Sequence, residues 1–105
     1  MLDLRPNPTL KDIQNYVKEM ETERGFDTDS VIQKCLHLGE ETGELFRSLR
    51  KNQGTKVDAN KESGDPALEM ADIIIILCAI ANRSNVDLEQ AFRDKEEINK
   101  QRIWK

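Results

Sequence analysis

The segment from Leu68 to Ala81 constrains the fold most, because it is apolar almost all round. As a helix, it has no wide polar face that could be turned to solvent. Such a helix is stable in water only when neighbouring helices cover most of its surface. We therefore expect this segment to form the central and most buried helix of the chain.

Capping signals and apolar periodicity predict an all-α chain, and no segment shows the alternation typical of a β-strand. Thr9, with Asp12 three residues on, has the spacing of a capping box, and Gly25 is a natural helix stop. Asp65-Pro66 supplies an N-cap and a first helical residue. The expected helices run from Thr9 to about Arg24, from near Ser30 to about Lys51, from Pro66 to about Ala81, and from Asp87 to roughly Gln101, with a polar linker over 52–65.

The second expected helix has one main apolar stripe, and the two cysteines of the chain both fall at apolar helical positions. Cysteines outside any paired motif behave as small hydrophobic residues in a reducing compartment. We therefore expect Cys35 and Cys78 to act as small hydrophobic residues and not as a disulfide or a metal site. The stripe consists of Val31, Cys35, Leu38, Leu45 and Leu49.

Length and charge limit the remaining possibilities. A chain of 105 residues is one domain, 1–105, and a helical chain this small often completes its core by pairing with a second copy. The net charge of −4 argues against broad nucleic-acid binding. The apolar run Ile73–Ala81 is too short to span a membrane, and Met1–Pro6 does not resemble a signal peptide. We expect a cytoplasmic protein that binds neither nucleic acid nor membrane.

Two pairs of acids, Glu41 with Glu44 and Glu69 with Asp72, are each spaced i, i+3. On a helix this spacing places both side chains of a pair on one face. Two such helices packed face to face would gather four carboxylates, which need protonation or a cation to coexist. Hard oxygen ligands favour Mg²⁺ or Mn²⁺, so the pairs predict a metal site suited to phosphate chemistry.

Each acidic pair also has a simpler interpretation. The run Glu40-Glu41-Thr42-Gly43-Glu44 has the composition of a solvated helix face. Asp72 lies inside an otherwise apolar helix, where a buried acid needs a partner, and that partner is a metal or a Lys or Arg of another helix. The two pairs together, on neighbouring helices, favour the metal.

Glu40-Glu41-x-x-Glu44, followed by a polar insert and Glu69-x-x-Asp72, resembles the EExxE…ExxD signature of the MazG-like nucleoside triphosphate pyrophosphohydrolases. The resemblance extends from about Thr9 to Trp104. It implies an all-α, four-helix bundle-like subunit that assembles as a homodimer or as a tetramer of two dimers. It also implies Mg²⁺-dependent cleavage of a nucleoside triphosphate, with Mn²⁺ as a substitute, to a monophosphate and pyrophosphate.

The resemblance assigns roles to individual residues. Glu41, Glu44, Glu69 and Asp72 match the positions that hold the metal, and Glu40 matches an additional acid that orients the attacking water or binds a further ion. Lys95, Asn99 and Arg102 match positions that contact the phosphates. Outside the resemblance, His37 lies one turn before Glu41, where it would border the expected pocket, but a surface or half-buried helix histidine is the favoured interpretation.

Two other functions remain open from the sequence. Phosphoribosyl-ATP pyrophosphatase is a related enzyme with similar helices and acids, although the Glu40-Glu41 pair and the long polar insert favour the MazG-like assignment. A non-catalytic helical interaction module that keeps the acids for regulation is the alternative outside enzymes. The sequence does not indicate which base or sugar a substrate would carry.

Overall fold

The computed structural model describes residues 2–61 and 64–105, and within these residues it contains helices and no strand. The helices are α1 (Leu10–Arg24), α2 (Val31–Asn52), α3 (Pro66–Arg83) and α4 (Leu88–Lys100). For the described residues, the prediction of an all-α chain is therefore confirmed. No helix among them is both long enough and apolar enough to cross a membrane.

The helix ends follow the capping signals read from the sequence. The Thr9 hydroxyl accepts a hydrogen bond from the Asp12 amide, and the Asp12 carboxylate accepts one from the Thr9 amide. Gly25 ends α1 in the left-handed conformation, with φ 79°. The Asp65 side chain accepts a hydrogen bond from the Ala67 amide at 2.9 Å and caps α3.

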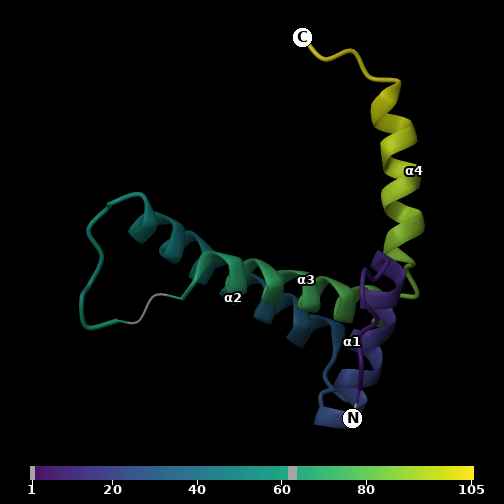
Figure 1. Ribbon diagram of the computed structural model, residues 1–105, viewed down its shortest axis with the longest axis horizontal. Helices are drawn as coiled ribbons and strands as arrows, with labels where there is room; N and C mark the ends of the chain where they lie inside the picture. Colours follow the sequence, from purple (N-terminus) through teal and green to yellow (C-terminus); the bar gives the residue numbers. More distant parts are fainter. Residues whose placement is uncertain (1, 62–63) are drawn as a thin grey trace.

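Helices α2 and α3 lie side by side as a hairpin, and α1 packs against the end of α3 that is far from the linker (Figure 1). Helix α4 packs mainly on α1 and points away from the hairpin (Figure 1). The radius of gyration is 16.5 Å. A compact chain of this length would have a radius near ~13 Å, so the single chain is extended.

The core lies between α1 and the second half of α3, where Val17 and Cys78 are almost completely buried. Helix α3 is central, as expected, but it is not covered on nearly every side. Met70, Ile74 and Leu77 are each more than 40% exposed, with values of 46%, 47% and 42%. The reason is geometric, since α1 and α2 together cover only part of the circumference of α3.

The apolar stripe of α2 is only partly buried. Leu38, Leu45 and Leu49 are half-buried, whereas Cys35 is exposed although it belongs to the same stripe. The buried residues of α2 are instead Lys34 and Ser48. Lys34 turns inward because its ammonium group pairs with the buried Glu21 at 3.2 Å.

Glu21 is the centre of a buried ion network that ties α1 to α3. The Arg83 guanidinium donates two hydrogen bonds to the Glu21 carboxylate, at 2.7 and 2.9 Å. It also donates to the carbonyl oxygens of Asp29 and Phe26, in the connection between α1 and α2. Burial by itself would raise the pKa of Glu21, but the hydrogen bonds from Arg83 and Lys34 outweigh it and lower this pKa.

Candidate metal centre

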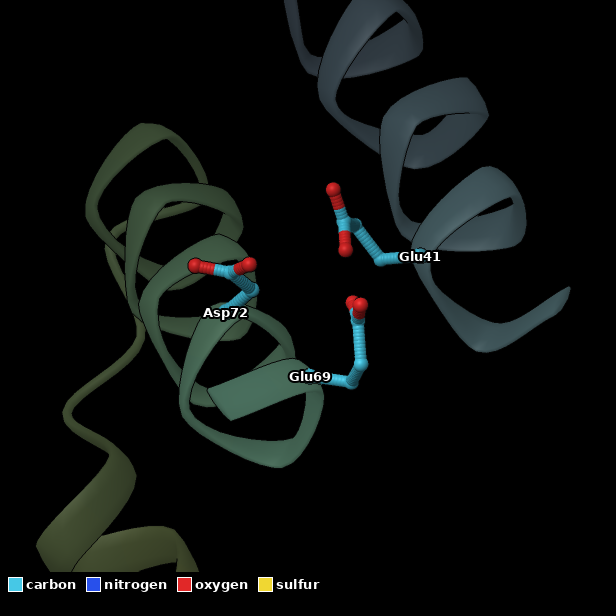
Figure 2. A group of neighbouring side chains, drawn as sticks. All are labelled: Glu41, Glu69 and Asp72. Carbon is cyan, nitrogen blue, oxygen red and sulfur yellow. The ribbon is translucent and has the colours of Figure 1, made fainter. Parts of the chain in front are cut away.

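Glu41, Glu69 and Asp72 converge where α2 faces the first turns of α3 (Figure 2). One carboxylate oxygen from each residue lies within 4.8 Å of the others. Glu41 comes from the middle of α2, whereas Glu69 and Asp72 project from one face of α3 because they are three residues apart. The antiparallel hairpin therefore brings together acids that are distant in sequence.

The centre leaves carboxylate oxygens without partners. The Glu41 side chain is only 12% exposed. Among the described residues, the Oε2 atoms of Glu41 and Glu69 are buried and accept no hydrogen bond. A buried, unpaired polar atom costs roughly 1–3 kcal/mol, and more when it is charged. Such atoms indicate a site built for a ligand that supplies positive charge.

The raised pKa of Glu41 marks the same position. Desolvation of the side chain, the hydrogen bond that joins it to Glu69, and the charges of Glu44, Asp72 and Glu69 raise the pKa of Glu41 to about 7. In the metal-free chain, a proton on Glu41 thus takes the place of a cation near neutral pH. A carboxyl group whose pKa is raised by burial and by neighbouring carboxylates is typical of a metal or catalytic site.

The raised pKa of Glu41 predicts how the metal-free protein responds to pH. Folded Glu41 keeps its proton up to a pKa of about 7, whereas the unfolded chain releases it near 4.5. The folded state binds more protons in this window, so its stability is expected to fall as pH rises from about 5 to about 8. Thermal unfolding in chelator at several pH values measures this effect.

The control for the pH prediction is Glu41→Gln, which should remove most of the pH dependence in this window. The acids whose pKa values are lowered, Asp12, Glu21 and Asp87, act below their ordinary pKa values and therefore outside it. A wild-type melting temperature that rises steadily from pH 5 to 8 would contradict the raised pKa of Glu41 in the folded, metal-free chain.

The donor set fits a hard divalent cation. Carboxylate oxygens are the ligands that Mg²⁺ and Mn²⁺ prefer. Two oxygens on opposite sides of a Mg²⁺ ion are roughly 4.2 Å apart, given bonds of about 2.1 Å. Adjacent oxygens on the same ion are roughly 3.0 Å apart, so the three oxygens, which lie within 4.8 Å of one another, would move closer together to bind one ion. Asp72 is exposed in the single chain, contrary to the burial expected from its apolar helix, since α1 and α2 cover only part of the circumference of α3.

The other acids of the first motif lie outside the group of three. Glu44 is exposed and outside the group of three, but its charge contributes to the raised pKa of Glu41. Glu40 is exposed. The Nε2 atom of His37 lies 3.4 Å from Glu41 Oε1, so His37 borders the centre through the side chain that it contacts.

The expected phosphate-contacting residues are not brought to this centre within one chain. Lys95 and Asn99 lie on α4 and Arg102 follows it, and this helix projects away from the hairpin (Figure 1). Asn99 is partly buried, and its side-chain oxygen has no hydrogen-bond partner among the described residues. The side chains of Lys95 and Arg102 are exposed.

The sequence analysis gave no role to two features of the structure. One is the Glu21–Arg83 pair, for which a signal existed, because Glu21 lies four residues after Val17 and therefore on the buried face of α1. The other is Gly64, whose backbone approaches the Glu69 carboxylate. Its only sequence signal is its position just before the cap Asp65.

Comparison with known proteins identifies relatives with an enzymatic name. The chain is 33% identical over 102 residues to dCTP pyrophosphatase 1 of Mus musculus, and 32% identical to the proteins of that name from Rattus norvegicus and Homo sapiens. Each alignment covers 92% of this chain. The chain spans about 60% of the length of these curated relatives. No family model matches the chain.

Proposed function

We propose, starting from the similarity to proteins named dCTP pyrophosphatase 1, that this chain is a metal-dependent nucleoside triphosphate pyrophosphohydrolase of the MazG-like type. The observation that carries the proposal is the convergence of three carboxylates within 4.8 Å, with two buried oxygens that lack partners. Water attacks the α-phosphorus, the α–β anhydride bond breaks, and pyrophosphate leaves with the nucleoside monophosphate as the other product. The proposed substrates are dCTP and related (deoxy)nucleoside triphosphates, and the proposed role is the removal of unwanted nucleotides.

Glu41, Glu69 and Asp72, together with Glu44, would hold Mg²⁺ or Mn²⁺. When bound, the metal neutralises the triphosphate and stabilises charge that develops in the transition state. Glu40 is proposed to orient the attacking water or to bind a further ion, because it precedes Glu41 on α2 and matches the additional acid of the resemblance. His37 keeps the Glu41 carboxylate in place through their 3.4 Å contact.

We further propose that α4 of a second copy supplies the cationic wall. Lys95, Asn99 and Arg102 follow the phosphate-binding pattern of the resemblance, yet α4 leaves the hairpin of its own chain. Basic and amide groups opposite the carboxylates would bind the phosphates. They would balance the negative charge of the triphosphate that the metal does not neutralise. The active site is then complete only in a homodimer or a tetramer of two dimers.

The function is tested by measuring pyrophosphate release from a panel of nucleoside triphosphates and phosphoribosyl-ATP, with Mg²⁺ and with chelator. Metal-dependent release from dCTP or another nucleoside triphosphate is the expected result. Release from phosphoribosyl-ATP alone would replace the proposal with the related pyrophosphatase. No release from any substrate, under conditions in which the chain binds metal, would leave a non-catalytic module as the assignment.

The chain is expected to form at least a dimer at micromolar concentration. Helix α2 exposes Ile32, Leu36 and Phe46 by 72%, 72% and 61%. Apolar surface of this extent is typical of an interface between subunits. Leu36→Asp should shift the chain toward monomer and reduce activity, because a charge at an apolar interface is left without a partner.

Analytical ultracentrifugation measures the association state. Lys18→Asp is the matched control. Lys18 is exposed on α1, so this variant introduces the same carboxylate away from the apolar surface. A wild-type chain that sediments only as a monomer would contradict the predicted dimer. It would also contradict the proposal that a partner's α4 completes the site.

A further inference from the structure

Gly64 lies directly against one of the three carboxylates of the metal centre. A Cβ atom placed on Gly64 would overlap the Oε1 atom of Glu69 and would lie 3.0 Å from its Cδ atom. The equivalent position on the helical glycines Gly39 and Gly43 has no neighbour within 4 Å. Of these three glycines, only Gly64 lies where an added side chain would contact the metal centre.

This approach follows from how α3 begins, and not from an accident of one side-chain rotamer. Asp65 is the N-cap and Pro66 the first helical residue, so Gly64 precedes the cap and Glu69 is the fourth residue of the helix. These two positions face each other at helix N-termini, where apolar residues often form a contact known as the hydrophobic staple. Here the pair is a glycine and a carboxylate.

Pro66 keeps Gly64 in that position. A proline at the first helical position cannot continue the hydrogen-bonding pattern backwards, and it disfavours helical backbone at the preceding residue. Asp65 is accordingly extended, with φ −79° and ψ 124°. The linker therefore turns at Asp65, and the backbone of Gly64 passes over the side of α3 that carries Glu69.

We propose that Gly64 is a positioning residue for Glu69, because the absence of a side chain leaves this carboxylate room to reach Glu41 and Asp72. The inference rests on the proposed metal-dependent function. A methyl group at this position would meet the flexible end of Glu69 and not a backbone atom. The clash is therefore relieved when Glu69 rotates away from the centre, at a cost to metal affinity and not to folding.

The test is the affinity for Mn²⁺ alone, measured by isothermal titration calorimetry without nucleotide. Gly64→Ala is expected to weaken Mn²⁺ binding by about tenfold, the effect typical of changes that misplace a metal ligand. The metal-free melting temperature should be unchanged or slightly higher, because the backbone of Gly64 is not in the left-handed region. Gly39→Ala, which adds a methyl group in open space, should leave Mn²⁺ affinity unchanged.

A double-mutant cycle separates positioning from a general effect on the linker. Glu69→Asp shortens the side chain by one methylene, so its carboxyl carbon takes the place of the Glu69 Cγ atom, 3.4 Å from the methyl group added by Gly64→Ala, and the overlap becomes an ordinary contact. Gly64→Ala should then cost much less in the Glu69→Asp background than in the wild type. Equal losses in both backgrounds, or wild-type affinity in Gly64→Ala, would overturn the inference.

The outcomes also separate this inference from the proposed function. A wild-type chain that binds no Mn²⁺ overturns both the metal centre and the role of Gly64. A chain that binds Mn²⁺ and shows the expected coupling, but releases no pyrophosphate, supports the role of Gly64 and overturns only the catalytic proposal.

Discussion

Replacing Glu41, Glu69 or Asp72 with its amide is expected to remove most of the pyrophosphate-releasing activity while the chain stays folded. Each replacement keeps the shape of the side chain and deletes a negative charge from a group of three oxygens within 4.8 Å. Metal stabilisation of the transition state is worth several kcal/mol, so a loss of about 100- to 1,000-fold in kcat/KM is expected. Steady-state kinetics with saturating Mg²⁺ measure the loss.

The same variants should lose their thermal response to metal. Saturation of the wild type at a hundred times Kd adds about 2.7 kcal/mol of stability. For a chain of this size, that gain raises the melting temperature by roughly 10 °C. Asp72→Asn should shrink the gain and raise the stability of the metal-free form, because it relieves repulsion with Glu41. An identical rise in melting temperature with metal in Asp72→Asn and wild type would show that Asp72 is not a metal ligand.

Glu97→Gln is the matched control for these amide variants. Glu97 is an exposed acid on α4 that pairs with Lys100 at 3.0 Å, and its side chain is 70% exposed. Surface pairs of this kind contribute less than about 1 kcal/mol. Wild-type activity and metal response are expected. Full activity in all three amide variants would contradict the metal centre, and the acids would then be interpreted as ordinary solvated surface residues.

Arg83→Ala is expected to destabilise the fold by about 3–5 kcal/mol, the typical cost of removing one partner of a buried ion pair. The Glu21 carboxylate, whose side chain is 6% exposed, would lose two of its hydrogen bonds and keep only Lys34. The carbonyl oxygens of Asp29 and Phe26 would lose their donors as well. Urea unfolding of the metal-free protein measures the change.

Two comparisons make the Arg83 prediction specific. Arg24→Ala removes an exposed cation from the last turn of α1 and should cost less than about 1 kcal/mol. Replacing both Glu21 and Arg83 with leucine should recover part of the loss, because neither member of the pair is then left as a lone buried charge and Lys34 keeps Asp29 at 3.4 Å. An Arg83→Ala chain within about 1 kcal/mol of wild type would show that the network does not stabilise the fold.

Local chemistry explains why the helices could be predicted. The Thr9 box, the Gly25 stop and the Asp65-Pro66 start act through atoms only a few residues apart, so their geometry depends little on the rest of the chain. The burial of individual side chains was harder to predict. Lys34 is buried and Cys35 exposed because the position of Glu21, a residue of another helix, decides which side of α2 faces inward.

The candidate centre was predictable in its residues but not in its geometry. Helical periodicity alone places Glu69 and Asp72 on one face of α3. Only the packing of the hairpin brings Glu41 to them and leaves Glu44 at the edge, since helix crossing depends on side chains along the whole contact. The role proposed for Gly64 has the same origin, because it depends on the path by which the linker enters α3.

The sequence by itself determined the class of fold, the limits of the helices and the acids available to a metal, because all of these depend on interactions within one or two helical turns. The tertiary structure decided which acids meet, which charges are buried in pairs and where α4 points. These properties depend on contacts between residues far apart in the chain, and each contact forms only where burial of the surrounding apolar surface outweighs the cost of desolvating polar groups.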